Sequence, residues 1–110
     1  MPRPARRGVY RARDQVANER WLADLRDAAD LLDLSAEARE RAIDLFLSAV
    51  PSEDRSKRAV LAASLYAGAL IAGDRRSQNA VADAAGVSRL TIQKRWKPLL
   101  KEAGLEPPTW

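Results

Sequence analysis

The sequence predicts an all-α fold, an orthogonal bundle of five helices around a buried central helix that ends in a helix-turn-helix. The apolar residues are mainly Ala and Leu, whereas the aromatic and β-branched residues that strands favour are scarce. Stretch 59–72 is apolar or small on every side, which is typical of a helix covered by other helices. A chain of 110 residues is long enough for one such domain.

The N-terminal residues 1–13 contain five Arg, two Pro and no acidic residue, so they predict a disordered basic arm. Two interpretations of the arm stay open: a solvated leader, or a segment that follows DNA phosphates. Residues 14–104 are predicted to form the single helical domain, with the helix-turn-helix at 77–97. Residues 105–110 are predicted to be a C-terminal tail.

The first helix is predicted over 14–32. One apolar stripe at helical spacing supports it: Trp21, Leu25, Ala28 and Leu32, widened by Leu22 and Ala29. Four acidic residues on this helix recur every three positions: Asp24, Asp27, Asp30 and Asp33. A step of three is shorter than a helical turn, so these carboxylates wind around the helix. They predict a solvated surface rather than a metal site.

The second helix is predicted to start after Ser35, a good N-cap, with Glu37 in the first turn and Pro51 as its stop. Its predicted inward residues are Ala38, Ala42, Leu45, Phe46 and Ala49. The third helix, 55–72, is the central one. Gly68 allows a neighbouring backbone to approach it closely, and Gly73 is predicted to end it.

Segment 77–97 has the spacing of a helix-turn-helix. Ser77 caps a short helix, Gly86 supplies the turn, and Ser88 caps the second helix. Ala82 is small where the two helices cross, and Ile92 and Trp96 face inward. In this geometry the N-terminal part of the second helix enters the DNA major groove.

The outward positions of the second helix include no carboxylate: they are Arg89, Leu90, Gln93, Lys94 and Lys97. Gln pairs with adenine, Leu packs on the thymine methyl group, and Arg and Lys bind phosphates. The predicted DNA-binding residues are Arg75, Arg76, Ser77, Gln78, Ser88, Arg89, Leu90, Thr91, Gln93, Lys94 and Lys97. The alternative is a capped helical hairpin that only packs against the core.

The charge distribution also indicates a polyanionic partner, here double-stranded DNA. Residues 14–54 hold eleven acidic and four basic residues, whereas residues 55–110 hold ten basic and four acidic ones. With the basic arm, the chain has two basic ends around an acidic middle.

Composition argues against an enzyme. The chain has no Cys and no His, which excludes a disulfide, a thiolate zinc site and the commonest general base. No phosphate-binding loop or metal-ligand spacing is present, so neither a cofactor nor a metal is predicted. No uncharged stretch approaches the roughly 20 residues that span a bilayer. We therefore expect no membrane partner, and an intracellular, cytoplasmic and nucleoid-associated location.

The stretch "RAVLAASLYAGALIAGDRRSQNAVADAAGVSRLTIQKRW" resembles the second half of a cyclin-like repeat of archaeal transcription factor B, the counterpart of eukaryotic transcription factor IIB. The family has an Ala-rich central helix with a "LY" pair, then a Thr-Gln or similar pair, then "VA..AGV...TI..RY". The matching residues are Leu65, Tyr66, Ser77, Gln78, Val81, Ala82, Ala85, Gly86, Val87, Thr91, Ile92, Arg95 and Trp96.

The resemblance implies a cyclin-like fold whose helix-turn-helix reads the promoter element upstream of the TATA box. It implies base-reading roles for Leu90 and Gln93, where the family commonly has Val and Arg. Pro98 departs from the family and is predicted to kink the last helix or end it near Lys97. The family also has a Cys-bearing zinc ribbon and two repeats, so one repeat without Cys predicts a stand-alone regulator.

Two functions follow from the sequence. The first is a DNA-binding transcriptional regulator, which reads a short site alone or as a homodimer on a pseudo-palindrome. The alternative is a protein-interaction module whose acidic first half binds TATA-binding protein or another transcription component.

Overall fold

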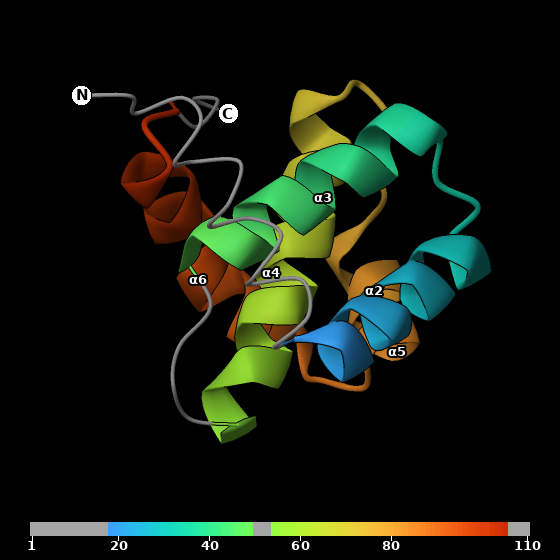
Figure 1. Ribbon diagram of the computed structural model, residues 1–110, viewed down its shortest axis with the longest axis horizontal. Coiled ribbons are helices and arrows are strands. Elements are labelled where there is room, and N and C mark those ends of the chain that lie inside the picture. The colour runs from blue at the N-terminus through green and yellow to red at the C-terminus, as the bar shows by residue number, and fades with distance from the viewer. Residues whose placement is uncertain (1–17, 50–53, 106–110) are drawn as a thin grey trace.

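The structure is a computed structural model that describes residues 18–49 and 54–105. Within these ranges every regular element is an α-helix (Figure 1). The helices are α2 (Glu19–Leu31), α3 (Ala36–Ala49), α4 (Asp54–Ile71), α5 (Gln78–Ala85) and α6 (Arg89–Glu102). The predicted all-α fold and its five helices are confirmed for this part of the chain. The basic arm, Pro51 and most of the tail lie outside the described residues, and the domain boundaries stay predictions.

Helix α4 lies at the centre of the bundle. It contacts each of the other four helices. In Figure 1, α3 crosses α4, α6 lies to its left, and α2 and α5 lie to its right. Residues 61–69 are buried without interruption. The prediction of a central helix covered on every side is therefore confirmed.

The α3 and α4 backbones touch at Gly68. A Cβ atom at this position would lie 2.6 Å from the backbone nitrogen of Ala42, which is too close for any side chain. After α4 the chain turns at Gly73, whose φ is 77°. The Asp74 amide then donates to the Ala69 carbonyl oxygen at 2.8 Å and closes the helix end.

The first two helices follow the predicted apolar pattern, but α2 begins at Glu19 with Asn18 as its N-cap, so the predicted start at residue 14 is wrong. The Ser35 hydroxyl accepts a hydrogen bond from the Ala38 amide at 3.1 Å, so the predicted N-cap is confirmed. Three of the four regularly spaced Asp residues of this region are exposed, and the fourth, Asp24, pairs with Arg58. No group of acidic residues in the described ranges is placed to hold a metal ion.

Helix α6 continues through Pro98 to Glu102, so of the two outcomes predicted for Pro98, an end near Lys97 is wrong and a kink stays a prediction. Pro98 is exposed, whereas the next two residues, Leu99 and Leu100, are buried. Burying two leucines stabilises the last turn by more than the loss of one backbone hydrogen bond costs. Among the described helices, none combines the length and the apolar character that crossing a membrane requires.

Candidate nucleic-acid interface

Both helices of the predicted helix-turn-helix start at a serine cap. The Ser77 hydroxyl accepts a hydrogen bond from the Ala80 amide at 3.0 Å. The Ser88 hydroxyl accepts one from the Thr91 amide at 3.2 Å and shares another with the Thr91 hydroxyl at 3.0 Å. These caps fix where α5 and α6 begin, since they satisfy amides that have no partner within the helix. The capping role predicted for both serines is confirmed.

The turn between the helices depends on Gly86. Its φ is 75°, in the left-handed region, and a Cβ atom there would meet nothing within 4 Å. The backbone conformation alone therefore favours glycine. The amides of Gly86 and Val87 both donate to the Ala82 carbonyl oxygen, which closes the C-terminal end of α5.

The inner face of α6 is anchored in the core. Ile92 and Trp96 are buried, and the Trp96 ring meets the Tyr66 ring of α4 edge to face, with 5.2 Å between ring centroids. This packing fixes the rotation of α6 about its axis. The opposite face is solvent-exposed as predicted, and it consists of Arg89, Leu90, Gln93, Lys94 and Lys97.

That exposed face is positively charged. The whole of α6 contains five basic residues and one acidic residue, which is Glu102 in its last turn. Leu90 is the exposed apolar side chain of the face, with 52 % of its surface accessible. The Nζ atom of Lys97 lies 5.5 Å from the centroid of the Trp96 ring, close enough for a cation–π contact.

Three predicted site residues from two helices are joined by side-chain hydrogen bonds. The Gln78 Nε2 atom of α5 donates to the Gln93 Oε1 atom of α6 at 2.7 Å. The Arg89 Nη1 atom donates to the Gln78 Oε1 atom at 3.1 Å. We call Gln78, Gln93 and Arg89 the glutamine relay. The sequence placed these residues on one surface but did not predict that they are bonded to one another.

Arg76, another predicted site residue, is bonded within the protein. Its Nε and Nη2 atoms donate to the carbonyl oxygens of Leu32 and Asp33, at the end of α2, at 2.9 Å each. Its Nη1 atom donates to the Asp74 carboxylate at 2.7 Å and to the carbonyl oxygens of Asp74 and Arg75. The guanidinium therefore has five acceptors and ties the α4–α5 loop to the α2–α3 turn. Arg75 itself is exposed.

Asp74 completes this connection. The backbone amide of Ser35 donates to its carboxylate at 2.8 Å, and Arg76 donates to the other carboxylate oxygen. The Ser35 hydrogen bond and, next, the Arg76 hydrogen bond lower the pKa of the Asp74 carboxyl below its ordinary value. The loop just before the helix-turn-helix is thus held by a charged, hydrogen-bonded pair.

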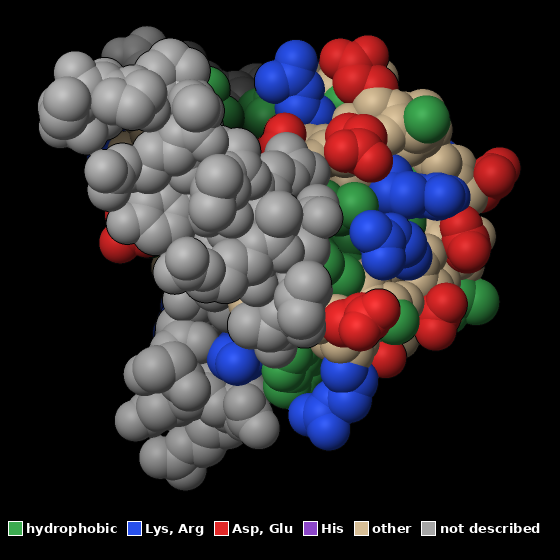
Figure 2. All heavy atoms as spheres, viewed as in Figure 1, with side chains coloured by type: hydrophobic (Ala, Val, Ile, Leu, Met, Phe, Trp, Pro, Cys, Tyr) green, Lys and Arg blue, Asp and Glu red, His purple; other side chains and the backbone are tan. Residues whose placement is uncertain are grey.

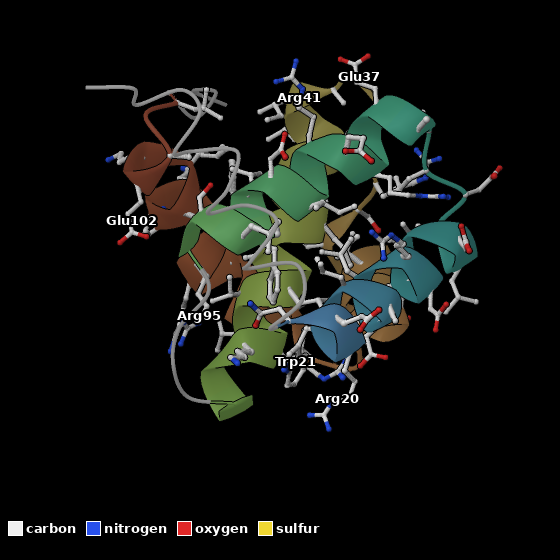
Figure 3. The ribbon with its side chains drawn as sticks, in the orientation of Figure 1. Arg20, Trp21, Glu37, Arg41, Arg95 and Glu102 are labelled. Carbon is white, nitrogen blue, oxygen red and sulfur yellow. The ribbon has the colours of Figure 1, made fainter. Side chains whose placement is uncertain are left out.

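Arg58 of α4 is a residue that the sequence did not single out. It pairs with Asp24 of α2 at 2.8 Å and donates to the Ala85 carbonyl oxygen, at the end of α5, at 3.1 Å. Its guanidinium also lies 5.2 Å from the centroid of the Trp21 ring, as does that of Arg20 (Figure 3). Arg58 thus connects three helices next to the Gly86 turn. No local spacing marks it, because its partners are 34 and 27 positions away.

A groove of about 500 Å³ lies beside α6, where that helix meets α3 and α4. Its charged lining residues are Lys94, Arg95 and Glu102, all from α6, and Figure 3 labels the last two. Ala and other apolar residues make up the remainder of the lining. The groove therefore adds apolar surface next to the basic face, without a nucleophile paired to a base.

Comparison with known proteins gives a consistent result. Residues 13–102 match the family model described as transcription factor TFIIB repeat. A transcription initiation factor IIB of Archaeoglobus fulgidus is 40 % identical over 78 residues, which cover 68 % of this chain and 24 % of that protein. One of Pyrococcus abyssi is 35 % identical over 83 residues, 73 % of this chain and 28 % of the relative. One of Methanosarcina mazei is 36 % identical over 78 residues, which cover 68 % of this chain and 23 % of that protein. The chain spans about a quarter of the length of these curated relatives.

Proposed function

The chain belongs to the transcription factor TFIIB repeat family, and from that premise we propose that it regulates transcription by binding double-stranded DNA through its helix-turn-helix. Membership of this family indicates a role in transcription. Contact with DNA through α6 is our inference from the geometry of the described residues.

One observation carries the proposal: the exposed face of α6 has cations, an amide and a leucine but no carboxylate over its first turns. Ile92 and Trp96 hold the opposite face in the core, so this surface is presented rigidly. A helix-turn-helix places this part of its second helix in the major groove. There, carboxylates would be repelled by phosphates, whereas Lys and Arg are attracted.

We assign each exposed residue a chemical role. Gln93 pairs with adenine, and Leu90 packs on a thymine methyl group. Arg89, Lys94 and Lys97 bind phosphates, and Arg75 does so from the α4–α5 loop. Polar contacts from the two helix N-termini complete the set, through Ser77, Gln78, Ser88 and Thr91. We leave Arg76 out of the set, because its guanidinium already has five acceptors within the protein.

The alternative function, a module that binds TATA-binding protein or another transcription component, depends on an acidic surface over α2 and α3. Figure 2 shows acidic and basic side chains interspersed over that part of the molecule. Several of the carboxylates are paired with arginines, as in Arg39–Asp30 and Arg41–Glu37. These pairs place cations among the carboxylates of α2 and α3, whereas the exposed face of α6 has no carboxylate over its first turns, so we favour DNA as the partner.

The test is selection of bound duplexes from a random pool by the full chain, at low and at high salt. We expect an enriched motif that disappears for Gln93→Ala, while circular dichroism shows unchanged helix content. A motif made of two half-sites about one DNA turn, or roughly 34 Å, apart would indicate a homodimer. Duplex binding without any motif would contradict the proposed base reading, and the absence of duplex binding would contradict the proposed function.

A further inference from the structure

We propose that Gln78 is a positioning residue that fixes the amide of Gln93 in the orientation that reads adenine. This inference rests on the proposed function and deepens it, since it names the residue that enforces the preference of Gln93 for adenine. Gln78 itself need not touch a base for this role.

The direction of the hydrogen bonds in the glutamine relay follows from Arg89. A guanidinium has only donors, so the Gln78 atom that faces it has to be the amide oxygen, Oε1. The Gln78 amide nitrogen is then turned to Gln93, and the Gln93 atom that receives it has to be an acceptor, Oε1. One arginine thus sets the orientation of two amides in succession.

The relay leaves the other end of the Gln93 amide available. Neither N–H of its Nε2 atom has a partner among the described residues, and its Oε1 atom keeps a second lone pair. A donor and an acceptor on one planar edge match adenine, which presents the N6 donor and the N7 acceptor in the major groove. Guanine presents two acceptors, N7 and O6, and would set one of them against Oε1.

Rotation of the Gln93 amide by half a turn would exchange its oxygen and nitrogen. In the relay, that rotation places an N–H group of Gln93 against an N–H group of Gln78 and breaks the 2.7 Å hydrogen bond. Without the relay, the Gln93 amide must lose this rotational freedom when it pairs with adenine, whereas guanine sets one of its two acceptors against Oε1 in either orientation. The relay therefore favours adenine by holding in advance the one orientation that pairs with it, and its effect lies in discrimination between bases more than in total affinity.

The experiment uses the full chain and two duplexes that differ in the one base pair assigned to Gln93 by the selection. One duplex has adenine at this position and the other has guanine. The measured quantity is the Kd for the guanine duplex divided by the Kd for the adenine duplex. Gln78→Met keeps the side-chain length and removes both hydrogen bonds, and we expect it to reduce the ratio about two- to tenfold, the value of one net hydrogen bond.

Gln78→Glu tests the direction of the bonds. A carboxylate still accepts from Arg89 but has no donor for the Gln93 oxygen. We expect it to lose adenine discrimination as Gln78→Met does, even though the added charge weakens binding to both duplexes alike. Asn79→Ala is the matched control, because Asn79 is the next amide of α5, is exposed, and lies outside the relay. We expect its ratio to equal that of the wild type.

The double variant Gln78→Met/Gln93→Ala separates the two roles. If Gln78 acts through Gln93, its ratio equals that of Gln93→Ala alone. If Gln93→Ala abolishes discrimination while Gln78→Met and Gln78→Glu preserve it, the positioning role is wrong and the proposed function stands. If the wild-type chain binds no duplex, the proposed function itself is wrong. A guanine preference in the wild type would also overturn the assignment of adenine.

Discussion

Two arginines on either side of α5, Arg76 and Arg89, have the same chemistry and opposite surroundings. Arg76 faces the end of α2 and donates to five acceptors there and in its own loop. Arg89 begins α6, is exposed, and has a single described acceptor, the Gln78 side chain. The comparison teaches that a cation beside a helix-turn-helix serves either the fold or the ligand, depending on which acceptors surround it.

The reason for the difference lies at the end of α2. The last carbonyl groups of a helix have no partner within it, and here the chain turns sharply because Asp33 has a φ of 56°. Arg76 supplies donors to the carbonyl oxygens of Leu32 and Asp33. The start of α6 presents amide donors, which Ser88 caps, and offers no carbonyl acceptors to an arginine. The Arg89 cation is therefore exposed, and we propose that it contacts a phosphate.

The largest effect on stability is expected for Arg76→Ala. The substitution removes a charged donor from two backbone carbonyls, and hydrogen bonds to charged groups contribute about 1.5–3 kcal/mol. We expect the free energy of unfolding, measured with urea, to fall by about that amount. Arg89→Ala is the control and should stay within about 0.5 kcal/mol of the wild type, as exposed substitutions do. Equal losses of unfolding free energy in both variants would show that Arg76 stabilises the fold no more than Arg89 does.

Asp74→Asn should have a smaller effect that depends on pH. Because the pKa of the Asp74 carboxyl is lowered in the folded state, its charge stabilises the fold at neutral pH. That contribution is complete above the ordinary Asp pKa of about 3.9 and is lost as the pH falls through the lower folded-state pKa. We therefore expect the variant to be less stable than the wild type at pH 7 and to approach it in acid.

Thermal unfolding of both proteins between neutral and acidic pH measures this difference. Asp83→Asn is the matched control, since Asp83 is exposed on α5 and has no ion pair within the described residues. A stability difference for Asp74→Asn that stays constant down to the most acidic pH would contradict the role given to its charge.

Lys94→Ala should affect DNA binding without affecting stability. Loss of one phosphate contact reduces the slope of log K against log salt concentration by about 0.9. Arg41→Ala removes the same charge from α3, where Figure 3 shows Arg41 beside Glu37 and away from α6. We expect its salt slope to match that of the wild type in fluorescence anisotropy titrations. Equal slopes for all three proteins would mean that Lys94 lies outside the interface.

Local patterns predicted much of this molecule. Serine caps, the Gly86 turn and the inward positions of α6 depend on residues a few positions apart, and the structure has each of them where the sequence indicated. The burial of α4 followed from its lack of any polar face. These features are set by backbone geometry and by periodicity, which a single sequence displays.

Contacts between distant residues were not predictable in the same way. Arg76 was expected on the DNA side because it precedes the helix-turn-helix, but its acceptors in α2 are 43 and 44 positions away. The glutamine relay joins residues 15 positions apart on different helices. The end of α6 was predicted too early, near Lys97, for a related reason. The burial of Leu99 and Leu100, which stabilises the helix beyond Pro98, depends on tertiary packing.

The smallest effect is expected for Leu90→Ala. Leu90 is half exposed, so its loss should leave stability within about 0.5 kcal/mol of the wild type. Packing on a thymine methyl group is an apolar contact the size of one methylene, which contributes about 0.8 kcal/mol or less. We expect Kd to rise by a factor of about four or less, and only for duplexes with thymine at the contacted position.

Deoxyuridine in place of that thymidine removes the same methyl group from the DNA. If Leu90 contacts the methyl, deoxyuridine weakens binding by the wild-type chain and has no further effect on Leu90→Ala, since the contact is already lost. Leu31→Ala serves as the control, because Leu31 is also exposed but lies on α2. Equal weakening of the wild type and Leu90→Ala by deoxyuridine would show that Leu90 does not contact that methyl group. The exposed cations of α6 and the glutamine relay would then account for the whole of the recognition proposed for α6.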